Sequence, residues 1–210
     1  MKTSNKFLLS VGAVAVLAAC GGMGSKGGNA GFPSADQAIA SSWENIPAGW
    51  EKRLVQDDTQ KICSAAKDKP SKADAERVEK MNLAMKVVYP ASGKLVGDWK
   101  KGEAIAQSGY GMRVGDNAPN RANGGNCYAC HQMTKAELSF GTLGPGLNQY
   151  GKLRGNSEAI VKYTYDKIYN SQAFSACSNM PRFGHNAILN PEQIADLVGL
   201  LMDPASPVNQ

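Results

Sequence analysis

The sequence has no long apolar run. None of its hydrophobic stretches reaches the roughly 18 residues that a membrane-spanning helix needs, which excludes a multi-span membrane protein. Histidine is also scarce: His131 and His185 are the only two, so any metal or haem site has few imidazole ligands available. Hydrophobic residues nevertheless make up 42% of the 210 residues, enough for a packed core and too many for a wholly disordered chain.

A basic stripe with interleaved aromatic residues is missing as well. The 23 lysines and arginines exceed the 18 acidic residues, and the resulting charge of +5 and pI near 8.9 could indicate nucleic-acid binding. Two of these basic residues, Lys2 and Lys6, lie in a predicted signal segment. Without residues 1–19 the chain has 21 basic and 18 acidic residues, a formal charge of +3, and its basic residues are scattered among acidic ones. We therefore expect no nucleic-acid partner.

The first 19 residues have the pattern of an export signal. Lys2 and Lys6 precede an apolar stretch of 13 residues from Phe7 to Ala19, which is the length of a signal-peptide core. The next residue, Cys20, completes a Leu-Ala-Ala-Cys sequence similar to the bacterial lipobox, where the cysteine is acylated and becomes the mature N-terminus. The alternative is ordinary cleavage after Ala18 or Ala19, which leaves a free thiol. Both interpretations predict a periplasmic protein, and the first predicts a membrane anchor.

The only regular secondary structure predicted for the mature chain is helical. Residues 20–33 contain six glycines and are predicted to be a flexible tether. Residues 34–95 are predicted to be a helical extension, with candidate helices over 50–63 and 71–88, the second capped by Ser71. No obvious chemistry is carried by this extension.

Residues 96–210 form the second predicted domain. One helix is expected over 99–107 after Gly97-Asp98, followed by a loop over 108–126 that is rich in glycine and asparagine. Asn156 is predicted to cap a second helix, and Asn190-Pro191 a final one that ends at Asp203. The sequence shows neither the alternating apolar and polar pattern of a β-strand nor an internal repeat, so the predicted fold class is all-α.

Cys127, Cys130 and His131 form the motif CYACH, the c-type haem attachment sequence CxxCH. Two thiols at this spacing can add to the two vinyl groups of one porphyrin, and the adjacent histidine then ligates the iron. A zinc site is an alternative, with His185 and Cys177 as the remaining ligands. A redox dithiol is another, but the βαβ context of thioredoxin-like motifs is missing. Export favours one covalently bound haem c.

Two more cysteines, Cys63 and Cys177, remain. Thiols in an oxidising compartment are usually paired, so we expect a disulfide between them, with two separate buried thiols as the alternative. With Cys20 acylated, this pairing leaves no cysteine without a chemical partner.

Met180 is the best candidate for the second axial ligand of the iron. It lies in a loop before the final helix and is followed by Pro181, which stiffens the chain. Met112, His185 and Cys177 are weaker candidates, and Met180 could instead be an apolar loop anchor. Methionine–histidine ligation raises the reduction potential and closes the iron to substrate, so it favours electron transfer over oxygen chemistry.

Four short motifs resemble class I cytochrome c: Gly97-Asp98, CYACH (127–131), LGPGL (143–147) and Met180-Pro181. The resemblance implies that the Pro145 carbonyl accepts a hydrogen bond from the His131 ring. It also implies that the first and last helices of the domain cross near Gly102.

Longer segments between 97 and 209 resemble the SoxX family, the monohaem subunits of the SoxAX thiosulfate-oxidising cytochrome. The segments are GNCYACHQM (125–133), ELSFGTLGPGLNQYGKLRG (137–155), YTYDKIYN (163–170), ACSNMPRFGH (176–185) and DPASPVN (203–209).

This resemblance implies an electron-transfer subunit in an L-cysteine S-thiosulfotransferase complex. The chain would pair with a SoxA-like haem subunit that performs the sulfur chemistry on a SoxYZ-like carrier protein, and it would pass electrons to another cytochrome c. No residue of this chain would be catalytic. The lipobox at Cys20 and the long extension depart from the common pattern, and we expect the extension to hold SoxA or to cover the haem. A free-standing, lipid-tethered electron carrier is the alternative, followed by a haem enzyme that uses Cys177 or an open iron site.

Overall fold

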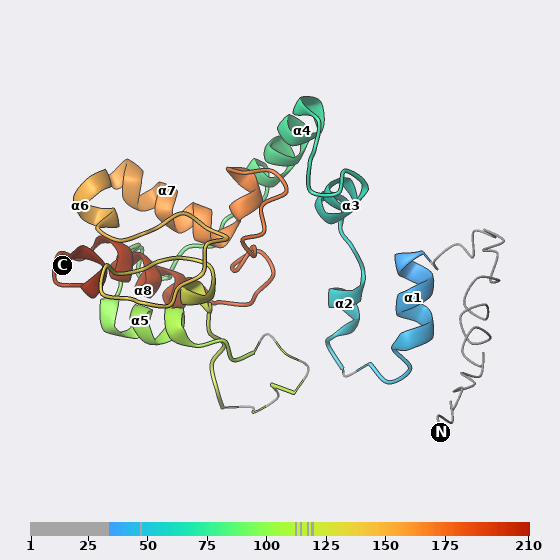
Figure 1. Cartoon of the computed structure of the whole chain (residues 1–210), viewed down its shortest axis with the longest axis horizontal. Coiled ribbons are helices and arrows are strands. Elements are labelled where there is room, and N and C mark those ends of the chain that lie inside the picture. The colour runs from blue at the N-terminus through green and yellow to red at the C-terminus, as the bar shows by residue number, and fades with distance from the viewer. Residues whose placement is uncertain (1–33, 47, 112, 114, 117, 119) are drawn as a thin grey trace, which may run out of the picture. The chain divides into compact units, whose positions relative to one another are not determined.

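A computed structural model describes residues 34–46, 48–111, 113, 115, 116, 118 and 120–210 (Figure 1). The predicted signal segment, Cys20, the glycine-rich tether and Met112 lie outside the described residues. The chain divides into two compact units between Leu54 and Val55. Residues 55–95 of the expected extension therefore pack in the same unit as the expected cytochrome c domain.

The described part of the first unit contains two short helices, α1 (Ala35–Ser42) and α2 (Glu51–Leu54). Ser34 caps α1 through a capping box with Gln37, in which each side chain accepts a hydrogen bond from the other residue's backbone N–H. No residue of α2 is buried.

The second unit contains the remaining helices. They are α3 (Asp58–Ala65), α4 (Lys72–Leu83), α5 (Trp99–Gln107), α6 (Tyr150–Arg154), α7 (Glu158–Tyr169) and α8 (Pro191–Met202), with 3-10 turns at Cys127–Ala129, Ser171–Ala173 and Pro207–Asn209. The described residues include no β-strand, and the all-α prediction is confirmed.

Three helix starts are where the capping residues predict them. Ser71, Asp98 and Asn190 each accept a hydrogen bond from a backbone N–H of the helix that follows. Asn190 also forms a capping box with Gln193. The cap of α7 was predicted one residue too early, because Ser157 rather than Asn156 accepts from the Ile160 N–H.

The helix predicted over 50–63 is wrong. It is interrupted between Leu54 and Asp58, because Asp57 starts a new helix by forming a capping box with Gln60. The helix predicted over 71–88 also ends early, at Leu83. Beyond it the chain is held by α7: the Tyr165 hydroxyl donates to the Val88 carbonyl at 2.8 Å, and the Tyr89 hydroxyl donates to Asp166 at 2.9 Å.

The core of this unit is built where α5 crosses α8. A Cβ atom placed on Gly102 would lie 2.1 Å from the carbonyl oxygen of Asp196, so only glycine permits this approach. The expected crossing near Gly102 is therefore confirmed. The Gly97 N–H donates to the Ala195 carbonyl at 2.8 Å and holds the start of α5 against α8. Fully buried side chains around the crossing complete the core: Tyr165, Leu189, Ile194, Val198 and Leu200.

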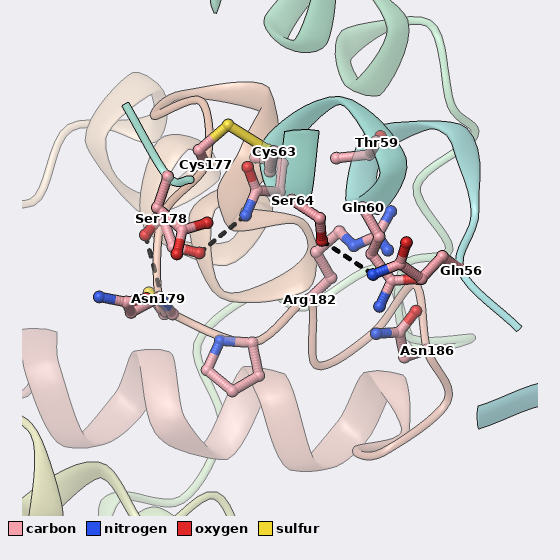
Figure 2. A pocket seen from close by; sticks show the side chains of 14 residues that line it. Gln56, Thr59, Gln60, Cys63, Ser64, Cys177, Ser178, Asn179, Arg182 and Asn186 are labelled. Carbon is pink, nitrogen blue, oxygen red and sulfur yellow. Dashed lines mark hydrogen bonds between the residues drawn. A yellow bond between two sulfur atoms is a disulfide. The ribbon is translucent and has the colours of Figure 1, made fainter. Parts of the chain in front are cut away.

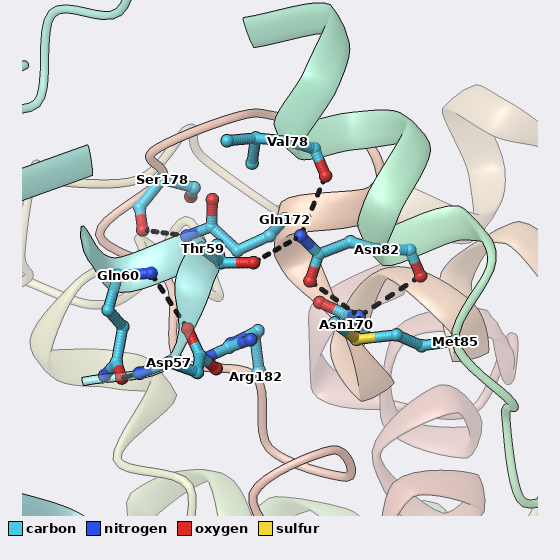
Figure 3. Close-up of polar contacts among 10 residues, drawn as sticks. All are labelled: Asp57, Thr59, Gln60, Val78, Asn82, Met85, Asn170, Gln172, Ser178 and Arg182. Atoms are coloured by element: carbon cyan, nitrogen blue, oxygen red, sulfur yellow. Dashed lines mark hydrogen bonds and ion pairs between the residues drawn. The ribbon is translucent and has the colours of Figure 1, made fainter. Parts of the chain in front are cut away.

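Helices α3 and α4 attach to the segment between α7 and α8 in three ways. The first is covalent, the disulfide between Cys63 of α3 and Cys177, whose Cα atoms are 5.3 Å apart. The second is a buried polar chain, in which the Asn82 side chain donates to Thr59 at 2.9 Å and accepts from Asn170 at 3.1 Å (Figure 3). The apolar contribution is small, since the buried cluster here consists of Val78 and the two cysteines.

The third attachment is an ion pair between Asp57 and Arg182, whose Oδ2 and Nη2 atoms are 2.5 Å apart. Arg182 is 5% exposed and Asp57 is 40% exposed. The other carboxylate oxygen of Asp57 accepts the Gln60 N–H, so one side chain both caps α3 and neutralises a buried arginine.

Replacing Gly102 by alanine tests the helix crossing. The added methyl group would meet the backbone of α8, so α5 and α8 must separate, and we expect a loss of about 2–4 kcal/mol in the free energy of unfolding. Urea unfolding measures it. Gly115→Ala is the matched control, because a Cβ there meets no atom within 4 Å. Equal stability of the two variants would contradict the close approach.

Replacing Asp57 by asparagine tests the ion pair, since asparagine can keep the helix cap and only the charge is lost. Partial burial raises the pKa of the Asp57 carboxyl, but the Gln60 N–H and the Arg182 guanidinium outweigh it, and the net pKa is lowered. The stabilisation is therefore present above the unfolded pKa of about 3.9 and is lost as the pH falls through the folded value.

We expect Asp57→Asn to lose about 1–3 kcal/mol of unfolding free energy at pH 7, because Arg182 is left without its carboxylate. Urea unfolding from pH 7 to pH 3 should show the difference from the unmodified protein shrinking below about pH 4. A difference that stays constant over this range would mean that the charge of Asp57 does not matter.

Candidate functional site

The CxxCH motif forms one tight turn. Cys127 begins a 3-10 turn, and its carbonyl accepts hydrogen bonds from the N–H groups of Cys130 at 3.1 Å and His131 at 2.9 Å. Asn126, just before it, adopts a left-handed conformation with φ of +49°. The turn therefore holds both thiols and the imidazole within one short, hydrogen-bonded piece of backbone.

The two thiols of this turn are free and half-buried. Burial raises the pKa of the Cys127 thiol to about 12. Redox-active CxxC motifs depend on a lowered thiol pKa, because the thiolate is the reactive form. The raised pKa of Cys127 disfavours the redox dithiol that the spacing alone leaves open.

The segment LGPGL runs alongside the turn. The Gly144 N–H donates to the Cys130 carbonyl at 2.8 Å, and the Leu147 N–H donates to the Gln132 carbonyl at 2.7 Å. The side chain of Leu143 is 74% exposed. An exposed apolar side chain beside two thiols suits the face of a porphyrin ring, which is itself largely apolar.

The ring of His131 is oriented by this segment. Its Nδ1 atom lies 2.8 Å from the Pro145 carbonyl oxygen, so Nδ1 carries the proton and donates it, and Nε2 keeps a free lone pair. Gly144 makes room for the ring, since a Cβ atom there would lie 2.1 Å from His131 Cε1. The hydrogen bond implied by the resemblance to class I cytochrome c is present.

Met180 lies in the segment between α7 and α8, residues 170–190, which is called the Met180 segment below. Its carbonyl accepts from the Ser171 hydroxyl at 2.5 Å, and its N–H donates to the Ser178 hydroxyl at 3.2 Å. The side chain is half-buried and packs against the same hydrophobic core as Cys127. The structure thus brings the CxxCH turn and Met180 to one core, although they are more than 40 residues apart in the chain.

The structure excludes one of the weaker ligand candidates, Cys177, and places another, His185, beside an ion pair. Cys177 is bonded to Cys63, so it is available neither to a zinc ion nor to a haem iron. The zinc alternative loses one of the four ligands it needs. His185 is half-buried, and burial together with the Arg182 charge lowers the pKa of its ring. It lies close enough to the Asp57–Arg182 pair for both charges to act on it.

A cavity of about 270 Å³ separates α3 from the Met180 segment (Figure 2). Its lining is predominantly polar. Residues from α3 and from the Met180 segment both contribute, among them Thr59, Cys63, Cys177, Met180, Arg182 and Asn186. The disulfide and Met180 therefore share one cavity.

Sequence reasoning named Cys127, Cys130, His131 and Met180 as candidates and missed what lies around Met180. The role of Asp57 had a usable signal, because an aspartate followed three residues later by glutamine is a capping box. Burial of Arg182 had none, because its partner lies 125 residues away in the chain. The hydrogen bond between Asn82 and Asn170 likewise could not be predicted from a local sequence pattern, because the two residues are 88 positions apart.

In the described part of the chain, no helix is both long and apolar enough to cross a bilayer. No protein-family model matches the sequence. The chain is 39% identical over 164 residues to an uncharacterized lipoprotein of Aquifex aeolicus, and the match covers 74% of each of the two proteins. This degree of identity over most of both chains places the protein in the same family as the Aquifex aeolicus lipoprotein.

Proposed function

We propose that this protein is a periplasmic, lipid-anchored monohaem cytochrome c that transfers single electrons as the SoxX-like subunit of a SoxAX-type complex. The observation that carries the proposal is the His131–Pro145 hydrogen bond next to the CxxCH turn. With Nδ1 donating to Pro145, the ring leaves Nε2 as the atom that can ligate iron, next to two free thiols that can bond the porphyrin, which is the arrangement that covalent haem c needs.

Each residue has one role in this proposal. Cys127 and Cys130 would form the thioether bonds, and His131 and Met180 would be the axial ligands. Bound in this way, haem supplies an iron that changes between ferric and ferrous states with little rearrangement. As a thioether ligand, the half-buried Met180 would favour the ferrous state and would close the iron to substrate. The sulfur chemistry would belong to the partner subunit.

Membrane anchoring is supported by two observations that do not depend on the haem. Cys20 follows a lipobox-like sequence, and the Aquifex aeolicus relative is described as a lipoprotein. Acylation of Cys20 would place the protein on a membrane surface in the periplasm. The glycine-rich residues 20–33 would act as a tether that lets the folded domain move away from that surface.

The same anchoring favours a second candidate function. A cytochrome on a flexible lipid tether could shuttle electrons between membrane enzymes without a SoxA-like partner. The resemblance of residues 125–133, 163–170 and 176–185 to SoxX favours the complex, whereas the lipoprotein relative fits both functions.

Met180→Ala tests the ligand assignment. We expect the purified protein to contain one covalent haem by the pyridine haemochrome assay and to show the near-infrared band of a methionine–iron(III) bond. The variant should keep the haem, lose the band and have a lower reduction potential, because a weaker ligand replaces the thioether. Met81→Ala on α4 is the control and should keep the band. An unchanged band in Met180→Ala would refute the assignment.

Co-expression with a SoxA-like haem protein, followed by membrane fractionation, separates the two functions. In a complex both chains should sediment with the membranes, and Cys20→Ser should release both together into the soluble periplasmic fraction. Release of this chain alone, with the other protein unaffected, would favour the free-standing carrier. Retention of Cys20→Ser on the membrane would contradict the lipid anchor.

A further inference from the structure

The segment that carries Met180 is held from outside by α3 and α4. We call residues 171–182 the ligand loop and α3–α4 the clamp. Apart from one 3-10 turn at its start, the ligand loop has no regular secondary structure. Its own contacts near Met180 are few: the Ser171 and Ser178 hydroxyls bond the Met180 backbone, and the Gln172 side chain donates to the Ser178 carbonyl at 2.8 Å.

The clamp holds the loop on both sides of Met180. Three residues before it, Cys177 is bonded to Cys63 of α3. Two residues after it, Arg182 is paired with Asp57 at the start of α3. Glu79 of α4 adds a weaker contact by accepting the Ala176 N–H at 3.3 Å. A displacement of Met180 would therefore have to break or stretch an attachment on at least one side.

Backbone strain shows that the attachment at Cys177 opposes a local preference. Cys177 has φ of +55°, in the left-handed region that a side chain disfavours by about 1–2 kcal/mol. Without the bond to Cys63, the backbone could relax to the right-handed or extended region. Because Met180 is only three residues away, this relaxation would move it.

Packing alone does not hold the loop against α3. The cavity of about 270 Å³ lies directly between them and is lined by Met180, Pro181 and Arg182 (Figure 2). The loop thus borders open space on this side, and the buried apolar cluster here is small: Val78 and the two cysteines, with Ile62 and Ala176 partly buried against it. The start of the loop and Met180 pack against the main core, but on the side that faces α3 the two attachments hold the loop in position.

From this geometry we infer that Cys63, Cys177, Asp57 and Arg182 are positioning residues for Met180, and that the clamp serves to keep its thioether in place as the distal ligand. The inference rests on the proposed function and goes beyond it, because it assigns a role to α3 and α4. When the clamp is released, the fraction of molecules with Met180 away from its ligand position rises. Exogenous ligands then bind in proportion to that fraction.

The test uses the full-length haem-loaded protein and two variants that release different sides. The double variant Cys63→Ser/Cys177→Ser removes the bond without leaving a free thiol, and Asp57→Asn removes the ion pair while keeping the disulfide. Asn209→Ala is the control. The Asn209 side chain is buried, and its hydrogen bonds, among them those to Gly151 and Leu201, are all to residues outside the ligand loop.

Three quantities are measured for each protein: the intensity of the near-infrared band, the dissociation constant of imidazole from the ferric haem, and the thermal midpoint. We expect the double variant to bind imidazole about tenfold or more tightly and Asp57→Asn several-fold more tightly, with a weaker band in both. Asn209→Ala should lower the thermal midpoint and change the imidazole constant by less than about twofold.

The outcomes separate the two proposals. Imidazole constants in both clamp variants equal to that of Asn209→Ala would mean that α3 and α4 only stabilise the fold, and would overturn the inference. If the double variant is too unstable to purify, the imidazole constant of Asp57→Asn alone decides the test. A wild-type protein that has haem but no near-infrared band would overturn the ligand assignment itself, and a protein without haem would overturn the proposed function.

Discussion

The bond between Cys63 and Cys177 is the constraint on which most of the second unit depends. It joins residues separated by 114 positions, and the loop that it closes contains α4, α5, the CxxCH turn and α7. In the chain-entropy model, closing a loop of this length in the unfolded chain stabilises the fold by about 4–5 kcal/mol. That is a large part of the stability of a typical domain. The bond also determines where α3 lies relative to Met180, since little apolar surface is buried between them.

The interface around this bond is unusually polar for a protein interior. Three buried side-chain atoms among the described residues have no hydrogen-bond partner: Asn170 Oδ1, Gln172 Oε1 and Arg182 Nη1. Gln172 and Arg182 both line the polar cavity beside α3. Because the apolar cluster next to them is small, the covalent bond and the Asp57–Arg182 pair are the main attachments at this interface. This interface holds α3 against the segment that carries Met180 with few buried apolar contacts. The contact between α5 and α8, in contrast, is closely packed.

The two sides of the candidate site, His131 and Met180, are held in position in different ways. His131 is oriented by its immediate surroundings, through the Pro145 carbonyl and the space left at Gly144. Met180 is oriented by distant parts of the chain, through α3 and the residues that pair with Cys177 and Arg182. A change near the CxxCH turn would therefore act on one proposed ligand, His131, whereas a change in α3 would act on the other, Met180, from more than 100 residues away in sequence.

The sequence by itself determined the local features. The spacing of Cys127, Cys130 and His131 requires no distant partner, and the caps at Ser71, Asp98 and Asn190 involve residues within three positions of each other. The pairing of Cys63 with Cys177 could be inferred by counting cysteines in an exported chain. Only the tertiary structure decided that Asp57 pairs with Arg182 and that the disulfide lies beside Met180. The reason is physical: capping and motif spacing depend on neighbouring residues, whereas burial of a charge and closure of a loop depend on which distant segments the core brings together.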